Sequence, residues 1–532
     1  MYRTVDPTPS QPSNFEFPFE GKLSEDNRWV IMEKLIPWSE FEVEYAKNFT
    51  CSTGAPAKSF RMALGALIIK ERLGTSDAET VEQIRENPYL QYFLGMSGYS
   101  NEAPFDSSMF VYFRQRIGVN LVNKINEKMV KNQTEVQGEE VEKKSSDLSE
   151  PKNQGKLILD ATCAPADIKY PTDLGLLNQA REHTEKIIDA LHNKNQSPVK
   201  KKPRTYRNKA RKEYLTLAKN RKPLRKKRRK TIKKQLQYIK RNLANIEGMG
   251  QLQLLSKSDY KKLLVVTEVY RQQLSMYEKK EQRIEDRIVS LTQPHIRPIV
   301  RGKAGKSVEI GAKLSASCRN GYVFLDRISW DNFNESLDLQ AQVEEFKRFT
   351  GFSPESIHVD RIYRTQLNRA WCKERGIRMS GVPLGRPPKN ISKSKKKQAQ
   401  SDERIRNSIE GKFGEAKRRF SLGRVMAKLS NTSETSIAIT FLVMNLSGLL
   451  RQAFWLFFFL FHNKNLYSGF LPLKISKDYV SSNKDEENLY CSDNSKFTHL
   501  SKGCFVTFSA SPTYFEALLT LDRVFFPLRK LL

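Results

Sequence analysis

The stretch Arg406-Asn-Ser-Ile-Glu410-Gly-Lys-Phe-Gly-Glu-Ala-Lys417 has the residue spacing of one face of an α-helix. Steps of four, three and four residues place an arginine, a glutamate, a phenylalanine and a lysine on a single stripe. A solvated helix face with an i,i+4 ion pair would show the same pattern. Gly411 and Gly414 each cost about 1 kcal/mol inside a helix. They therefore favour a functional face to whose backbone something must come close.

The charge of the chain indicates a polyanionic partner. The 532 residues carry a formal net charge of +32, and their 39% hydrophobic content is ample for about three or four globular units. Residues 200–241 hold 21 lysines and arginines and one acid, Glu213. Such a segment is suited to nucleic acid or to an anionic membrane surface. A charge run that adheres to RNA without specificity would have the same composition.

Cysteine usage and hydrophobic patterning place the protein in a reducing cytosol. The six cysteines are scattered without a C-x-x-C pair, which disfavours both a disulfide framework and a zinc site. The N-terminus lacks the apolar core of a signal peptide. The segment 437–461 is almost wholly apolar and long enough to span a bilayer, but Arg451 lies within it. We therefore expect a buried C-terminal helix and no membrane partner.

Residues 1–130 are predicted to form a helical N-terminal DNA-binding domain. The segment 58–73 has an apolar helical face that ends near Gly74, and a second helix begins at Ser76 and stops before Pro88. A short glycine-containing turn between two helices suits a helix-turn-helix module, and a plain helical bundle fits equally well. A third helix covers 109–117 and carries Arg114 and Arg116 as candidate DNA contacts.

A polar linker and a change of pattern follow this domain. Residues 131–155 lack aromatic side chains and are predicted to be a linker. The first part of a catalytic domain is then expected over 156–195, with a buried strand ending at Asp160, a strand and turn at 167–173, and a helix from 174 to 193.

A basic helical insertion is predicted over residues 196–294. Apolar residues recur at heptad-like spacing over 232–246 and again over 263–291, with a glycine-containing loop at 248–250 between them. Two facing heptad helices indicate an antiparallel helical hairpin.

The second part of the catalytic domain is predicted over residues 295–455. Alternating residues over 307–330 surround Asn320-Gly321, a strong β-hairpin signal. A helix at 337–349 leads to a short strand that ends at Asp360. A helix, a strand and a basic loop at 383–397 then lead to the helix 401–420, which carries Glu410. Residues 456–532 form a poorly defined C-terminal tail.

Three carboxylates at the ends of two strands and on one helix can converge at the edge of a mixed sheet. Asp160, Asp360 and Glu410 supply the oxygen ligands that Mg²⁺ prefers. Two such ions can activate a hydroxyl and stabilise the leaving oxygen of a phosphodiester. The abundant lysines and arginines would hold the polyanionic substrate.

Each acid has a rival in the sequence. Asp167 or Asp173 could replace Asp160, although Asp160 directly ends an apolar strand. Asp326 competes with Asp360, because Phe324-Leu-Asp-Arg-Ile and His358-Val-Asp-Arg-Ile are alike. Only Asp360 precedes the helix, strand and helix that lead to Glu410. His358 is interpreted as a strand side chain rather than a ligand.

The chain resembles bacterial insertion-sequence transposases of the Asp-Asp-Glu class. Their third block has Tyr, two residues, Arg, three residues, Glu, six residues and Lys, and Arg406, Glu410 and Lys417 fit that spacing. Glu403 occupies the tyrosine position. Asp360 occupies the second-block position, which also separates it from Asp326, and the spacing excludes Glu415 as the third acid. Further similarity lies at 86–93, 104–108, 411–418 and 435–446, so the resemblance covers roughly residues 1–450.

The resemblance implies an α+β/α/β multidomain fold. A helical N-terminal DNA-binding domain would accompany an RNase H-like mixed-sheet catalytic domain, which the basic helical hairpin interrupts. The implied catalytic and metal-binding residues are Asp160, Asp360 and Glu410, with two Mg²⁺ ions and Mn²⁺ as an alternative. Predicted DNA contacts are Arg406, Lys412, Lys417, Arg418, Arg225, Lys226, Lys227, Arg228, Arg229, Lys230, Arg114 and Arg116.

The implied activity is cleavage at insertion-sequence ends followed by strand transfer into target DNA. The expected partners are the terminal repeats, target DNA and a second copy of the chain, with no small-molecule substrate. The expected location is the bacterial cytoplasm, on the nucleoid when DNA is bound. A catalytically inactive DNA-binding copy and a Mg²⁺-dependent nuclease without joining activity remain as alternatives.

Overall fold

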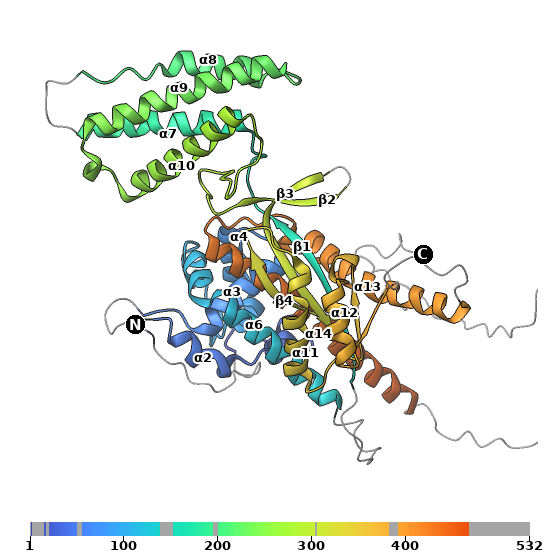
Figure 1. Ribbon diagram of the computed structural model, residues 1–532. Helices are drawn as coiled ribbons and strands as arrows, with labels where there is room; N and C mark the ends of the chain where they lie inside the picture. The colour runs from blue at the N-terminus through green and yellow to red at the C-terminus, as the bar shows by residue number, and fades with distance from the viewer. Residues whose placement is uncertain are drawn as a thin grey trace, which may run out of the picture. The chain divides into compact units, whose positions relative to one another are not determined.

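The structure is a computed structural model that describes residues 2, 15–17, 21–49, 56–138, 153–194, 201–303, 306–381 and 392–467. Most of the predicted linker 131–155, part of the basic loop 383–397 and nearly all of the tail 456–532 lie outside these residues. The described helices and strands succeed one another along the chain as Figure 1 shows.

A mixed sheet forms the centre of the described structure. Its strand order is β2-β3-β1-β5-β6, and β4 pairs with β3. β1 pairs antiparallel with β3 and parallel with β5. The strands are β1 (Lys156–Pro165), β2 (Arg297–Lys303), β3 (Lys306–Arg319), β4 (Tyr322–Ser329), β5 (Ser356–Val359) and β6 (Arg378–Met379). This mixed sheet, combined with helices, fits the RNase H-like expectation.

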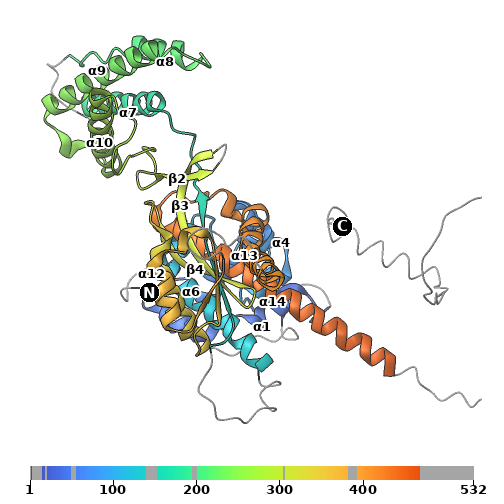
Figure 2. The same cartoon turned by 45° about the vertical axis from the view of Figure 1, so that its right-hand side comes forward.

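Side chains of β1 alternate between two apolar clusters on the two faces of the sheet. Leu157 and Leu159 pack with residues of α11 (Leu339–Thr350) and α12 (Gln366–Glu374). Ile158 packs with residues of α13 (Lys393–Arg419) and α14 (Ser430–Tyr467). Figure 2 shows α12 and α13 on opposite sides of the sheet. Because both faces are covered, β1 is a nearly continuous buried strand.

The predicted hairpin at Asn320-Gly321 is confirmed. β3 and β4 pair antiparallel from Arg319 and Tyr322 outward. Asn320 has φ of 51° and Gly321 has φ of 84°. Positive φ at both central residues is what a two-residue hairpin turn requires, and asparagine followed by glycine tolerates it best.

The N-terminal region is helical, as expected. Its elements are α1 (Arg28–Leu35), α2 (Trp38–Ala46), α3 (Phe60–Leu73), α4 (Asp77–Glu86), α5 (Pro88–Phe93) and α6 (Met109–Gly138). Ser76 caps α4 by accepting the backbone N–H of Glu79, and Gly74 ends α3 with φ of 70°. The helix predicted at 109–117 continues beyond a kink at Gly118. These helices share one apolar cluster with the α13–α14 face of the sheet.

The predicted helical hairpin is a group of four helices. They are α7 (Asp173–Lys194), α8 (Arg207–Ala218), α9 (Arg225–Met249) and α10 (Lys257–Lys279), with a 3₁₀ turn at Leu252–Leu254. Leu177 of α7 packs with Ile239 of α9 and Val266 of α10. The helix expected at 174–193 therefore packs with the insertion rather than with the sheet.

Two further expectations differ from the structure. α10 ends at Lys279, and Lys280 has a left-handed backbone conformation. The near-heptad spacing of apolar residues continues to residue 291, but the helix does not. The expected strand at 167–173 is absent from this described segment, and an isolated bridge pairs the preceding residue, Ala166, with Val425. Ile288 and Leu291 are nonetheless buried, and periodicity alone does not distinguish such packing from a regular helix.

The apolar C-terminal helix α14 packs into the core. Within the described residues, one helix, at Ser430–Phe454, is long and apolar enough to cross a membrane. Its apolar window is 72% buried inside the protein. Phe441, Leu442 and Met444 are fully buried. Burial of this kind is that of a core helix, as the sequence predicted.

The remaining elements connect the strands that carry the candidate acids. Short 3₁₀ turns lie at η4 (Glu335–Leu337), η5 (Arg361–Tyr363) and η6 (Ser421–Gly423). The η4 turn follows β4 and precedes α11, whereas η5 directly follows β5.

A buried amide joins α14, β4 and α6, and we predict that it stabilises the fold. The Asn445 side chain accepts the Val323 N–H at 3.0 Å, and its amide donates to the Val323 carbonyl at 2.8 Å and to Asn126 Oδ1 at 3.0 Å. Asn445→Ala leaves these groups buried without partners and should lower the free energy of unfolding by about 2 kcal/mol or more. Urea unfolding followed by tryptophan fluorescence measures the change. Asn120→Ala, at an exposed position of α6, is the control and should shift it by less than about 0.5 kcal/mol. Equal effects would contradict the prediction.

Candidate active site

Two of the predicted acids lie next to each other because their strands pair in parallel. The register pairs Leu159 of β1 with Val359 of β5, and the next residues along the two chains are Asp160 and Asp360. One Asp160 carboxylate oxygen accepts the Ala161 N–H at 2.8 Å. The Asp360 carboxylate caps η5 by accepting the Arg361 N–H at 2.6 Å. The parallel register thus fixes the positions of both residues.

The third acid comes from α13, which covers the same face of the sheet. Ile409 and Phe413 of α13 are buried in the cluster that contains Ile158 of β1. Asp160 shares the Ile158 face by alternation. Glu410 follows Ile409, and its side chain is 54% exposed. Glu410 therefore lies at the solvent edge of the helix that packs against β1.

The pKa of Asp160 reports the proximity of these groups. Burial raises the pKa of the Asp160 carboxyl to about 6, and the N–H of Ala161 opposes that shift. The charges of Glu335, Glu410 and Asp360 raise the pKa further, in that order of size. Desolvation and three negative neighbours both disfavour the ionised form. Asp160 therefore occupies a site where an added cation would be stabilised.

On α13, Arg406 forms an ion-pair network with Glu403 and Glu410. Arg406 Nη1 donates to Glu410 at 2.9 Å, and Arg406 Nη2 donates to Glu403 at 2.6 Å. The hydrogen bond from Arg406 lowers the pKa of Glu403, whereas the negative charge of Asp360 raises it. Burial lowers the pKa of Arg364. The charges of Asp360, Glu403 and Arg406 also act on this pKa, so the four side chains lie close together. Glu403 is thus part of the same charged cluster.

The donor set suits a hard divalent cation, but the described carboxylates are not arranged as ligands. No group of three His, Cys, Asp or Glu side chains within the described residues is close enough to hold a metal ion. Carboxylate oxygens are what Mg²⁺ prefers. Asp160, Asp360 and Glu410 are near enough to interact electrostatically, and Glu410 is exposed enough to change rotamer. The donor chemistry of the three carboxylates therefore fits Mg²⁺, although their described positions do not form a metal site.

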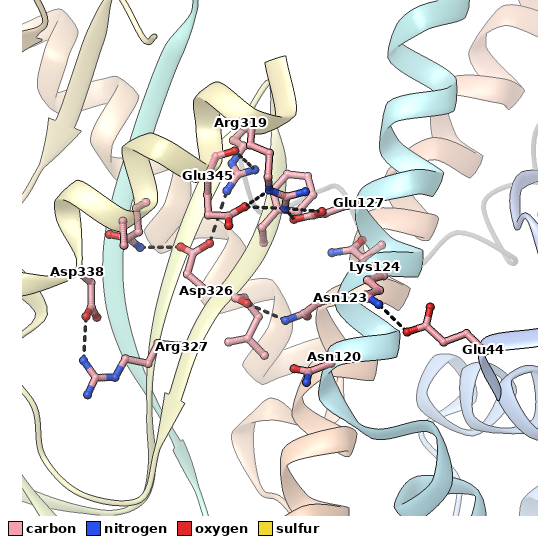
Figure 3. Close-up of a pocket in the computed structure, with 16 residues that line it drawn as sticks. Glu44, Asn120, Asn123, Lys124, Glu127, Arg319, Asp326, Arg327, Asp338 and Glu345 are labelled. Carbon is pink, nitrogen blue, oxygen red and sulfur yellow. Dashed lines mark hydrogen bonds and ion pairs between the residues drawn. The ribbon is translucent and has the colours of Figure 1, made fainter. Parts of the chain in front are cut away.

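Asp326, the rival of Asp360, belongs to a different part of the protein. Ser317 Oγ and Gln342 Nε2 donate to its carboxylate at 3.0 and 2.6 Å, and Arg319 lies 3.7 Å away. It lines a cavity of about 640 Å³ between α6, β4 and α11 (Figure 3). Burial raises the pKa of Asp326 to about 6 as well. The pKa therefore does not separate the rivals, whereas the neighbours of Asp160 do.

The other rival acids are engaged in contacts within the fold. Asp167 accepts from Arg424 at 2.8 Å, and Asp173 accepts from Arg287 at 2.6 Å. Glu415 lies 3.4 Å from Arg451. The acids whose charges act most on Asp160 are instead Glu335, Glu410 and Asp360.

His358 and Asp402 tie α13 to the sheet. His358 is fully buried on β5, and its Nδ1 lies 3.7 Å from Asp402 of α13. Arg378 of β6 makes two hydrogen bonds to the same carboxylate, at 2.8 and 2.9 Å. Burial lowers the pKa of His358, which disfavours its charged form. His358 thus has the structural surroundings expected of a strand side chain.

The glycines of α13 leave space rather than accommodating another part of the chain. A Cβ atom at Gly411 would meet nothing within 4 Å, and one at Gly414 would meet Arg418 Nη2 at 3.3 Å. The described protein therefore does not supply the close approach that the sequence suggested, and the face stays open to an external partner.

The two arginines of the N-terminal domain that were predicted to bind DNA interact with other residues of the fold. Arg114 is 6% exposed and binds Asp77 through two hydrogen bonds, at 2.6 and 3.2 Å. Its guanidinium therefore joins α6 to α4 and is not presented to solvent. Arg116 is partly buried and stacks over Phe49, 4.4 Å from the ring centroid. On α13, by contrast, Arg418 is exposed, and Lys412 and Lys417 are partly exposed.

The basic run of α9 is mostly exposed. Arg225, Lys226, Lys227, Arg228 and Lys230 are exposed at its N-terminal end. Arg229 instead stacks on Tyr277 of α10, 4.1 Å from the ring centroid, and donates to the Tyr277 carbonyl at 2.9 Å. Five of the six predicted contacts are thus available to a phosphate backbone, and one fastens α9 to α10.

Sequence reasoning missed Glu335. It lies on η4, and its charge is the largest carboxylate contribution to the raised pKa of Asp160. Its partner is Lys313 of β3, at 3.1 Å. No spacing rule linked residues 313 and 335 to Asp160, because the three meet only through the sheet and the turn that follows β4.

Comparisons with known proteins identify two segments. Residues 357–447 match the family model described as Transposase DDE domain, and residues 17–116 match Transposase domain (DUF772). The first segment contains Asp360 and Glu410, but not Asp160. The two segments together make up less than half of the chain.

A curated relative gives no further activity. The uncharacterized protein ORF8 in the nfe locus of Rhizobium meliloti is 29% identical over 177 residues, which are 32% of this chain and 80% of that protein. No solved structure matches. The two family matches support an insertion-sequence transposase of the Asp-Asp-Glu class. The matched catalytic domain indicates a nucleotidyl-transferase-type enzyme, a class that acts on DNA and generally uses divalent metals.

The raised pKa of Asp160 predicts a pH-dependent stability in metal-free protein. The folded-state pKa, about 6, exceeds the value of about 3.9 expected when unfolded, so the folded state binds the proton more tightly. Stability is therefore lost as pH rises from about 4 to about 6. Asp160→Asn should add up to about 3 kcal/mol to the free energy of unfolding at about pH 7.5, and little at about pH 4.

Urea unfolding in the presence of EDTA at both pH values measures this difference. Glu344→Gln, which removes an exposed acid from α11, is the matched control and should have little effect at either pH. An Asp160→Asn variant that is less stable than wild type at about pH 7.5 would contradict the prediction.

Proposed function

We propose that this protein is a DNA transposase that cleaves insertion-sequence ends and joins the freed 3′-hydroxyl to target DNA. The observation that carries the proposal is the parallel register of β1 and β5. It places Asp160 beside Asp360, while α13 brings Glu410 within electrostatic range of Asp160. The match of residues 357–447 to a transposase DDE domain supports the same assignment.

Asp160, Asp360 and Glu410 would hold two Mg²⁺ ions, with Mn²⁺ as an alternative. Bound there, the ions would supply activation of the attacking hydroxyl and stabilisation of the leaving oxygen. Arg406 positions Glu410 through its hydrogen bond at 2.9 Å. Metal binding would relieve the repulsion that raises the pKa of Asp160.

The cations of α13 would hold the substrate. Arg418 is exposed, and Lys412 and Lys417 are partly exposed on the helix that carries Glu410. Arg406 would contact phosphate near the cleaved end once Glu410 binds metal. Glu403 bonds to this arginine at 2.6 Å. The glutamate thus adds negative charge where the family has a tyrosine, and phosphate would have to displace or bypass it.

DNA binding would extend over two other regions. The N-terminal helices would read the terminal repeat, with Arg114 stabilising the domain through Asp77 rather than touching DNA. The exposed end of α9 would bind flanking DNA. Joining two element ends favours a homodimer, and a cytoplasmic protein that binds the nucleoid would meet its substrate directly.

The alternatives differ in chemistry. An inactive copy would bind ends without cutting, and a nuclease would cut without joining. The acids required for catalysis are all present, and the family matches do not favour an inactive copy.

An assay of joining tests the proposal. Purified protein is incubated with a pre-cleaved element end and a plasmid target in Mg²⁺. Wild type should give joined product, whereas Asp160→Asn, Asp360→Asn and Glu410→Gln should each reduce joining by about a hundredfold or more, because each removes a charged metal ligand. Nicking without joining would support the nuclease, and binding alone would support the inactive copy.

Asp326→Asn is the control for the second acid. It should retain joining, and circular dichroism and a thermal melt check that the variant is folded. If a folded Asp326→Asn protein loses joining while Asp360→Asn retains it, the assignment of the second acid is overturned.

The basic end of α9 should contribute to DNA affinity by neutralising phosphates. Replacing Arg225, Lys226, Lys227, Arg228 and Lys230 by glutamine should weaken binding and flatten the slope of log K against log salt, by about 0.9 for each phosphate that is no longer neutralised. Fluorescence anisotropy with labelled duplex measures the slope. Lys257→Gln and Lys261→Gln, at exposed positions of α10, form the control within the same insertion. An unchanged slope in the α9 variant would exclude phosphate binding there.

A further inference from the structure

A second charge pair lies beside the candidate metal centre. Lys313 Nζ is 3.1 Å from Glu335 Oε2 and donates to the Phe333 carbonyl at 2.6 Å. The side chains of Lys313 and Glu335 are 11% and 15% exposed. Lys313 also lies 4.8 Å from the centroid of the Phe333 ring. These contacts fix the position of the Lys313 ammonium group, which in turn fixes the position of the Glu335 carboxylate.

The turn that carries Glu335 packs on the turn that begins with Asp360. Asn368 of α12 donates to the Ser336 carbonyl at 2.8 Å and to the Tyr363 carbonyl at 2.9 Å, so one amide joins η4 to η5. Asn368 is 5% exposed. Lys313 of β3 pairs in register with Cys163 of β1, three residues beyond Asp160. The buried amide therefore holds the turn of Glu335 against the turn that begins with Asp360.

Electrostatics agree with this placement. The charge of Glu335 acts on Asp160 more strongly than that of Glu410 or Asp360. It also acts on the buried Tyr363, whose pKa burial raises well above its usual value.

We infer that Glu335 and Lys313 form a positioning pair that sets the cation affinity of the Asp160 centre. The inference rests on the proposed function, because it assumes that Asp160 binds a divalent metal. Glu335 supplies negative charge close to Asp160, and Lys313 compensates that charge and holds the carboxylate in place. The net charge of the pair, rather than its packing, determines how tightly the centre binds its ions.

This charge balance gives opposite expectations for the two residues. Glu335→Gln keeps the side-chain size and leaves Lys313 as an uncompensated cation, so metal binding should weaken. Lys313→Met leaves Glu335 as an uncompensated anion, so metal binding should tighten. The double variant Glu335→Gln/Lys313→Met restores the net charge of wild type and should bind metal nearly as wild type does.

Mn²⁺ binding to the full-length protein, measured by isothermal titration calorimetry without DNA, tests the inference. Glu335→Gln should raise the Kd about tenfold or more, Lys313→Met should lower it, and the double variant should fall within about threefold of wild type. Glu344→Gln is the control for loss of an acid from the same part of the chain and should leave the Kd unchanged. Circular dichroism of each variant checks that the chain is folded.

The outcomes separate this inference from the proposed function. If Asp160→Asn abolishes Mn²⁺ binding but Glu335→Gln binds as wild type does, the inference falls and the proposed metal centre stands. If Asp160→Asn binds Mn²⁺ as tightly as wild type, both fall. If both single variants and the double variant weaken binding alike, the pair acts through packing, and the role of its charge is overturned. Because Glu335→Gln is nearly isosteric, its result alone decides the inference should Lys313→Met not fold.

Discussion

The parallel pairing of β1 with β5 is the constraint on which the rest of the candidate site depends. It brings Asp160 and Asp360 side by side, where two carboxylates repel each other and one of them is largely desolvated. Such an arrangement costs stability unless a cation or a proton compensates it. The neighbouring elements are accordingly arranged around this charge, with α13 on one side and the η4 and η5 turns at the strand ends.

The ion pairs at the site form two groups. Arg406 holds Glu403 and Glu410 on α13, whereas Arg378 fastens the same helix to the sheet through Asp402. The first set can exchange partners with metal or phosphate because Glu403 and Glu410 are about half exposed. Asp402 is buried, and its two hydrogen bonds to Arg378 keep the helix in place while the exposed set changes partners.

The basic surface also divides into functional and structural cations. Arg114 and Arg229 were predicted to contact DNA, as were the cations next to them in the sequence. Each of the two instead joins two helices of the fold. Composition gives the net charge of a segment but not which guanidinium finds an internal partner. The exposed cations of α9 and the glycine-lined face of α13 remain for an external polyanion.

The sequence by itself determined the local elements: the capped helices α3 and α4, the Asn-Gly hairpin, and the strand that leads to Asp360. It also predicted the strand of Asp160, but wrongly ended it there, because pairing with β3 extends β1 to Pro165. These depend on residues close together in the chain, whose turn and capping preferences and apolar periodicity act locally. Only the tertiary structure decided that Asp326 lies apart from Asp160, that α7 packs with the insertion, and that Glu335 and Lys313 join the charged centre. Those outcomes depend on strand register and on packing between distant segments, which no spacing along the chain encodes.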